Sequence, residues 1–235
     1  DDDGPAGTAR FRRPAGIAVD AAGNLFVTDR ESHTIRRIAP GGEVSTLAGV
    51  PGAAGSRDGA GNDARLNGPT GIAIDPSGNL WVADTGNGRI RKVTQGGVVT
   101  TPGKPSPPWF PDAQDVAVDG AGNVLVADRQ DGLIWRVSSE GARTVLAAID
   151  SPVGVSVDAA DDVWVISGYM DTVYRVTPAG VVTSVAGRRE EPDAYFLWSR
   201  VEDGTGEDVL FAGPTALAAG PGSRIAILDS HLLRL

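Results

Sequence analysis

One sequence unit recurs along the chain of 235 residues, and it constrains the fold more than any other feature. The copies read GIAVDAAGNLFVTD from Gly16, GIAIDPSGNLWVAD from Gly71, DVAVDGAGNVLVAD from Asp115, GVSVDAADDVWVIS from Gly154 and ALAAGPGSRIAILD from Ala216. Each contains two short runs rich in β-branched residues around a turn, and the Gly-Asn pair of that turn suits positive φ. We therefore predict two antiparallel strands per copy and interpret Asp-x-x-Gly-Asn as a structural motif.

Two further strands are predicted after each unit. The third strand begins as TIRRIA in the first copy, and a basic residue recurs in it at Arg37, Lys92, Arg136, Arg175 and Arg234. A fourth strand, such as EVSTLAG, follows in four copies, and the fifth copy stops before it. Repeats of four short strands are typical of propeller blades.

We predict an all-β fold, a β-propeller of four-stranded antiparallel blades. The repeats lie approximately at residues 14–49, 69–103, 113–148, 152–187 and 214–235, within a single domain of residues 1–235. Five repeats are visible and a closing strand is not evident in this segment, so a ring of five or six blades is predicted. A strand preceding Asp1 in a longer protein would pair beside residues 232–235 and remove an exposed sheet edge.

A second element precedes three of the copies. It starts with Asp-Gly and ends with Pro eleven positions later, and it carries an apolar residue at Phe11, Leu66 or Phe211. We expect an ordered loop that packs between blades. Its carboxylates are few and lack the spacing of the twelve-residue calcium loop, so no cofactor is predicted. Calcium or another divalent ion is the less favoured alternative.

Composition excludes several classes of partner. The formal net charge of −9 opposes a phosphate backbone, so no nucleic-acid partner is predicted. The chain has no cysteine and therefore no disulfide, thiolate metal site or thiol nucleophile. No apolar run approaches the roughly 18 residues that span a bilayer, so we expect no membrane insertion of this segment. These features leave the oligomeric state undetermined.

The units P-x-G-I-A-V-D-x-x-G-N-L-x-V-x-D, S-H-T-I-R-R-I and V-S-T-L-A-G resemble NHL repeats, and the resemblance covers nearly the whole chain. Ser32-His33-Thr34 and Ser230-His231-Leu232 stand where that family carries Asn-His-Leu, and the match is weakest in the fifth copy, where Gly220 replaces the turn aspartate. The resemblance implies a propeller, commonly six-bladed, that mostly binds partners and less often is an enzyme. Its bacterial branch is similar to secreted, periplasmic or surface modules of larger proteins, which implies an extracytoplasmic location.

Positions that break the internal pattern indicate where binding could occur, because the blade itself does not need them. The connections before the third and fifth copies are enlarged, and the fourth copy replaces the aspartate after its second strand with Ser167. Propellers place these connections on one face around the channel mouth. Aromatic residues in such polar loops are enriched at binding sites, and the alternative is that the rings fold back over the channel mouth. The candidate binding residues are Trp109, Phe110, Asp115, Tyr169, Met170, Tyr195, Phe196 and Trp198.

No catalytic residue and no metal ligand is predicted. The two histidines, His33 and His231, both occupy repeat positions, and no serine lies in a G-x-S-x-G elbow. The family resemblance extends to propellers that are metal-dependent lactonases and lyases. At the channel entrance position of the repeats, however, Asp115 is the only charged residue, and one carboxylate is a poor metal cage.

We therefore predict a non-catalytic recognition or scaffold propeller that binds a protein, peptide or glycan through its loop-rich face. The alternative function is a divalent-metal-dependent lactonase-type or lyase-type enzyme with its site at the channel mouth. A third interpretation is a spacer within a longer surface protein.

Overall fold

The structure is a computed structural model, and it describes residues 2–103, 109–187, 208–209, 211, 213–220, 224–229 and 232–234. Strands form nearly all of its regular structure, together with two short 3-10 helices, η1 (Gly61–Asp63) and η2 (Thr85–Asn87). The predicted all-β class is confirmed. Over these described ranges, no helix has the length and apolar character needed to cross a bilayer.

Four antiparallel sheets, called blades 1 to 4, each contain the four strands predicted from the repeat. Blade 1 contains β2 (Pro14–Val19), β3 (Leu25–Asp29), β4 (Thr34–Ile38) and β5 (Glu43–Ala48). Blade 2 contains β7 (Ile72–Ile74), β8 (Leu80–Asp84), β9 (Arg89–Val93) and β10 (Val98–Thr100). Blade 3 contains β11 (Ala113–Val118), β12 (Val124–Asp128), β13 (Leu133–Val137) and β14 (Arg143–Ala148). Blade 4 contains β15 (Pro152–Val157), β16 (Val163–Ser167), β17 (Thr172–Val176) and β18 (Val182–Ala186).

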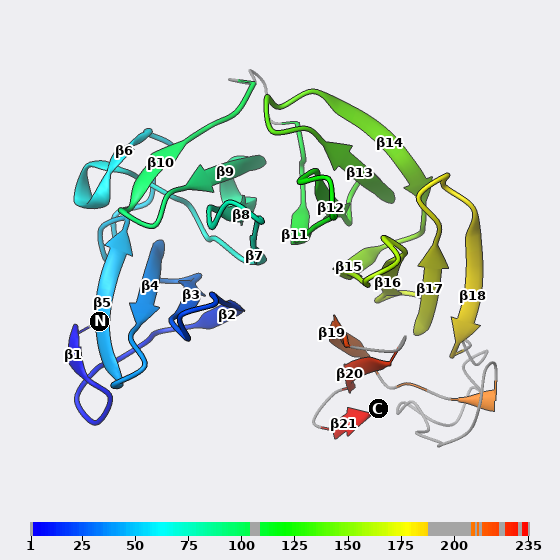
Figure 1. Cartoon of the computed structure of the whole chain (residues 1–235), viewed down its shortest axis with the longest axis horizontal. Coiled ribbons are helices and arrows are strands. Elements are labelled where there is room, and N and C mark those ends of the chain that lie inside the picture. Colours follow the sequence, from blue (N-terminus) through cyan, green and yellow to red (C-terminus); the bar gives the residue numbers. More distant parts are fainter. Residues whose placement is uncertain are drawn as a thin grey trace, which may run out of the picture.

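The last sheet has three strands, β19 (Pro214–Ala219), β20 (Ile225–Asp229) and β21 (Leu232–Arg234). Figure 1 shows the sheets side by side in an arc, with the first strand of each sheet nearest the centre. Successive first strands are in contact, β2 with β7, β7 with β11, β11 with β15 and β15 with β19. This arrangement is that of a β-propeller with four complete blades, and the predicted ring of five or six blades stays a prediction.

The Asp-x-x-Gly-Asn motif folds as an aspartate-capped turn. Asp20 follows β2 directly, and one of its carboxylate oxygens accepts hydrogen bonds from the backbone N–H groups of Ala22 (2.9 Å) and Asn24 (2.8 Å). Gly23 has a φ of 82°, in the left-handed region that glycine adopts without steric cost. The structural interpretation of the motif is confirmed.

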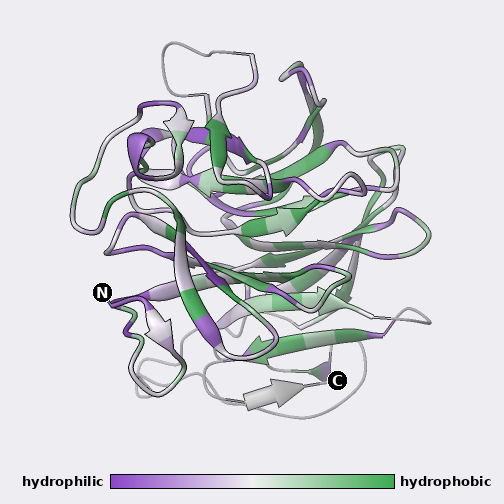
Figure 2. Ribbon diagram, turned by 60° about the vertical axis from the view of Figure 1, so that its left-hand side comes forward, coloured by the Kyte–Doolittle hydropathy of each residue, from purple (hydrophilic) through white to green (hydrophobic). Residues whose placement is uncertain are grey.

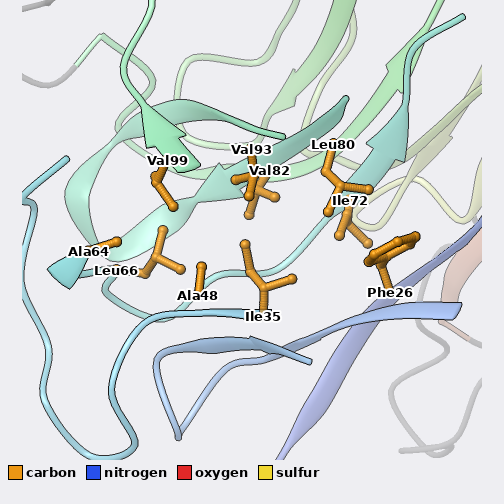
Figure 3. Packing of buried hydrophobic residues seen from close by; sticks show 10 residues of the cluster. All are labelled: Phe26, Ile35, Ala48, Ala64, Leu66, Ile72, Leu80, Val82, Val93 and Val99. Carbon is orange, nitrogen blue, oxygen red and sulfur yellow. The ribbon is translucent and has the colours of Figure 1, made fainter. Parts of the chain in front are cut away.

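The core lies between blades. Bulky side chains of the second strands, Phe26, Trp81, Leu125 and Trp164, are almost fully buried. Figure 3 shows how Phe26 and Ile35 of blade 1 face Ile72, Leu80 and Val82 of blade 2. Figure 2 shows the same principle over the molecule, with hydrophobic residues concentrated in the strands and hydrophilic residues in the connections. Blade packing therefore supplies most of the buried apolar area, the main favourable term in folding.

The Asp-Gly loops are ordered, as predicted, in their first two copies. Unexpectedly, each adds a short outer strand, because β1 (Gly4–Pro5) pairs with β5 and β6 (Gly59–Ala60) pairs with β10. The Asp58 carboxylate accepts hydrogen bonds from the Arg91 guanidinium (2.8 Å) and the Thr101 hydroxyl (2.8 Å). Arg91 is fully buried, and it also donates to the buried Asp84 carboxylate at 2.6 Å. Asp58 and Asp84 thus both neutralise the buried Arg91 of the third strand. In blade 1, Asp3 of the first loop pairs in the same way with the buried Arg36.

Four of the five recurring basic residues of the third strand occupy equivalent positions, and Arg234 does not. Arg37, Lys92, Arg136 and Arg175 pair across strands with the bulky residues of the second strand, as in the pairing of Arg37 with Phe26. Arg234 instead pairs with Ile227, the register of Arg36 opposite Val27. Thr34 and Leu232 both pair with the aspartate that ends the second strand, so Arg234, two residues after Leu232, corresponds to Arg36 and not to Arg37.

Equivalent isoleucines test the packing between blades. Ile72 of blade 2 is 6 % exposed, whereas Ile17, at the same place in blade 1, is 63 % exposed. We expect Ile72→Ala to lower the free energy of unfolding by about 2–5 kcal/mol, because burial is lost and a cavity forms. Ile17→Ala should cost less than about 1 kcal/mol. Urea unfolding of the two variants measures the difference, and equal losses would contradict the assignment of the buried faces.

Candidate functional site

A groove with a volume of about 490 Å³ lies on the face formed by the turns after the second strands and the connections between blades. Its walls come from the β3–β4 turn, the connection into β7, helix η2 and the connection into β11. Sequence reasoning did not find this groove, because these four segments are far apart in the chain. The lining residues are Arg30, Glu31, His33, Asn67, Gly68, Thr85, Gly86 and Asp112.

His33 is held in place by its backbone and by blade 2. Its φ is 59°, in the left-handed region, and its imidazole Nδ1 accepts a hydrogen bond from the backbone N–H of Gly68 at 2.9 Å. Because Nδ1 acts as an acceptor, the neutral ring carries its proton on Nε2. His33 therefore links two blades, and its ring lines the groove. The second histidine of the predicted repeat position, His231, lies outside the described residues.

Arg30 follows a buried carboxylate. Asp29 accepts hydrogen bonds from the backbone N–H groups of Arg12 (2.9 Å) and Arg13 (2.8 Å), and the Arg30 N–H donates to the carbonyl of Arg13 at 2.9 Å. The backbone beneath Arg30 is therefore fixed. In the part of the chain that the structure describes, the Arg30 guanidinium makes no hydrogen bond or ion pair.

The two acidic residues of the groove already have basic partners. Glu31 lies 3.6 Å from the guanidinium of Arg13, and both side chains are exposed. The Asp112 carboxylate accepts a hydrogen bond from Nε of Arg129 at 2.7 Å and another from the side-chain amide of Gln114. Their charges are therefore largely compensated within the protein.

The remaining wall is rigid. Asn67 and Gly86 are joined by two hydrogen bonds, from the side-chain amide of Asn67 (3.0 Å) and from the backbone N–H of Gly86 (2.8 Å). A Cβ atom added to Gly86 would lie 2.6 Å from the Asn67 side chain, so only glycine fits there. The Thr85 hydroxyl donates to the carbonyl of Ala113 at 2.7 Å. This wall offers a defined shape and no free charge.

Trp109 and Phe110, two of the predicted binding residues, pack on the outer part of blade 3. Phe110 is 2 % exposed, and its ring meets Trp135 edge-on at a centroid distance of 6.3 Å. Trp109 is half-buried, with the Arg143 guanidinium 4.8 Å from its ring centroid. Phe110 lies six residues before Val116 of the first strand, just as Phe11 and Leu66 lie six residues before the equivalent Ile17 and Ile72. That spacing was visible in the sequence and marks Phe110 as a packing position.

Asp115 lies near the centre of the arc and joins three blades. Its carboxylate accepts hydrogen bonds from the backbone N–H of Val116 (2.9 Å) and from that of Val155 in blade 4 (3.0 Å). It also fills the space beside Gly71 of blade 2, where an added Cβ atom would lie 2.4 Å from its oxygen. Burial in this crowded place disfavours the charged form and raises the pKa of Asp115 to about 7, although two hydrogen bonds act in the opposite direction.

The other predicted binding residues are divided between two regions. Tyr169 and Met170 lie in the turn after β16, on the same face as the groove, and Tyr169 is 53 % exposed. Tyr195, Phe196 and Trp198 lie outside the described residues. Among the predicted residues that are described, the packing of Phe110 and Trp109 separates them from the Tyr169 turn, so the structure does not gather them into one cluster.

Among the described residues, no three histidine, aspartate or glutamate side chains lie close enough together to hold a metal ion. Asp115 is committed to two backbone N–H groups, and Asp3 and Asp58 are committed to arginine and threonine. The described carboxylates therefore do not form the ligand set that a resident divalent ion would need.

A family model for the NHL repeat matches residues 11–38 and 66–93. These ranges contain the first three strands of blade 1 and of blade 2. The resemblance predicted from the sequence is confirmed at these two positions, and the chain carries NHL repeats within a β-propeller fold.

Curated relatives share only part of the chain. It is 38 % identical over 94 residues to Protein SUPPRESSOR OF QUENCHING 1, chloroplastic, from Arabidopsis thaliana, a match that covers 40 % of this chain and 9 % of that protein. It is 37 % identical over 93 residues to Teneurin-3 from Mus musculus, covering 34 % of this chain and 3 % of that protein. The chain thus spans less than a tenth of these relatives.

Solved structures share the fold over nearly the whole chain. The match to virginiamycin B lyase from Staphylococcus aureus has a TM-score of 0.67 at 17 % identity and covers 97 % of this chain and 70 % of that one. The match to a chain of a nidogen/laminin complex has a TM-score of 0.67 at 19 % identity and covers 92 % and 72 %. At this level of identity the likeness shows the fold alone.

The burial of Phe110 gives a stability prediction. We expect Phe110→Ala to lower the free energy of unfolding by about 3–5 kcal/mol, because it leaves a cavity beside Trp135. Phe110→Leu, which copies the residue of blade 2, should cost less than about 1.5 kcal/mol. Chemical denaturation of both variants provides the measurement. A cost below about 1 kcal/mol for the alanine variant would show that the ring is not part of the core.

The raised pKa of Asp115 predicts a pH dependence of stability. Between the unfolded value near 4 and the folded value of about 7, only the folded state binds the proton, so stability falls as pH rises through about 7. From pH 5.5 to pH 8 the loss should be about 2 kcal/mol more than in Asp115→Gly, which carries the glycine of blades 1, 2 and 4. Thermal unfolding at both pH values tests this, and parallel pH profiles would refute it.

Proposed function

We propose that this NHL-repeat propeller is a recognition module that binds a protein or peptide partner through the face formed by the second-strand turns and the connections between blades. One observation carries the proposal: the groove on this face holds a guanidinium, that of Arg30, with no partner among the described residues. Binding faces are typically concave surfaces with a few positioned polar groups.

The rest of the face supports the same function. The groove walls are fixed by hydrogen bonds between blades, from Gly68 to His33 and between Asn67 and Gly86, so little conformational entropy is lost when a partner binds. The exposed ring of Tyr169 lies on the same face and offers the large amphipathic contact that is enriched at binding hot spots. We extend the proposal to one propeller domain over residues 1–235, with five or six blades when the ring is closed.

The likeness to a chain of a nidogen/laminin complex supports protein binding as a use of this fold. The likeness to virginiamycin B lyase favours the second candidate, an enzyme at the channel mouth, and the buried carboxylate of Asp115 is the one observation in this chain that agrees with it. We favour recognition, because the described carboxylates do not fit a metal site.

Selection of a phage-displayed peptide library on the purified chain tests the proposal. We expect peptides to be enriched and to bind at least ten-fold more weakly to Glu31→Trp, which places a large ring at the groove. Glu140→Trp, at another exposed glutamate, in the turn between β13 and β14 on the opposite face, is the matched control and should bind normally. Failure to enrich any peptide, or equal weakening by both variants, would count against the proposed face.

A further inference from the structure

We infer that the groove beside Arg30 and His33 binds a carboxylate of the partner protein, an inference that rests on the proposed function. The first ground is the balance of charge in the groove. Glu31 is paired with Arg13, and Asp112 is paired with Arg129, both within 4 Å. Arg30 is left as the groove's uncompensated charge, on a protein whose formal net charge is −9.

The second ground is the kind of donor that lines the groove. A guanidinium presents up to five N–H groups in a planar fork that matches the two oxygens of a carboxylate. The hydrogen bond from Gly68 to Nδ1 of His33 fixes the neutral imidazole with its proton on Nε2, and both residues line the groove. Arg30 and His33 come from the same turn, so the two donor groups are held by one short segment.

The third ground is the effect of the two acidic residues on the charge of the anion that fits the groove. The carboxylates of Glu31 and Asp112 border it, and with their partners Arg13 and Arg129 they leave the groove one positive charge, that of Arg30, which matches an anion with one negative charge. A phosphate, with nearly two charges at neutral pH, is disfavoured relative to a carboxylate with one. A cationic ligand group would have to displace Arg13 or Arg129 from its partner.

Nuclear magnetic resonance titration of the whole chain tests the inference with small probes. N-acetyl-glutamate α-amide offers a side-chain carboxylate, N-acetyl-diglycine offers a terminal carboxylate, and N-acetyl-glutamine α-amide is the neutral match to the first probe. We expect saturable shifts of the Gly68 and Gly86 amide resonances with one or both acidic probes, and none with the glutamine probe. The comparison between the two acidic probes tells whether the partner's side chain or its terminus fits better.

Variants identify the group responsible. Arg30→Ala should weaken binding of the acidic probe at least ten-fold, and Arg30→Lys should retain part of it, because the charge remains while the fork is lost. Arg224 is an exposed arginine directly before β20, outside the groove. Arg224→Ala removes the same charge there and should bind like the parent protein. Binding should also weaken as salt rises from about 0.01 to 0.15 M, as expected for a partly exposed charge pair.

The possible results separate the inference from the proposed function. Enriched peptides that bind equally well after their acidic residues are replaced and their termini amidated would overturn the carboxylate inference and leave the recognition face standing. Equal shifts with the glutamate and glutamine probes, tighter binding of inorganic phosphate, or unchanged binding by Arg30→Ala would also overturn it. Absence of any enriched peptide would instead remove the proposed function.

Discussion

The rest of the molecule depends on a buried carboxylate at the end of the second strand of the blade. Asp29, Asp84 and Asp128 each accept a backbone N–H from the connection that enters their own blade. Each carboxylate is fully buried, so loss of the connection would leave a desolvated carboxylate without a hydrogen-bond donor, which is costly. The same connections form the groove face. In blades 1 to 3, the interaction that fixes the entering connection therefore also preorganises the surface for which we propose a function.

The third strand of a blade is packed against the connection that precedes the blade in two different ways. In blades 1 and 2, an Asp-Gly loop supplies Asp3 or Asp58 to neutralise a buried arginine of the third strand. In blade 3, Trp135 occupies that strand position, and Phe110 with Trp109 covers it. Removing one member of a buried charge pair is costly, whereas an aromatic cluster needs no counter-charge. An arginine at this position of the third strand thus goes with an Asp-Gly loop before the blade, and a tryptophan goes with an aromatic connection.

Much of the fold could be predicted from the sequence, because each turn and strand repeats and errors in one copy are corrected by the others. The groove could not, since it joins residues such as Arg30, Asn67 and Asp112 that belong to different repeats. Phe110 was assigned to binding because it stands in a proline-rich insertion, although its spacing from the strand marks it as core. The alignment of Arg234 with Arg37 is wrong by one residue, because a basic residue alone does not show which strand position it occupies, and the pairing of Arg234 with Ile227 does. The pattern within one repeat predicts strands and turns, whereas the position of the groove depends on contacts between residues of different repeats.

The central claim is that the groove face is where this propeller meets its partner, and amide hydrogen exchange with and without an enriched peptide tests it most directly. The account predicts that bound peptide slows exchange at residues 30–33, 66–68, 85–86 and 112, with little change elsewhere. Protection confined to the turns at residues 20–24 and 75–79, on the opposite face, would contradict it.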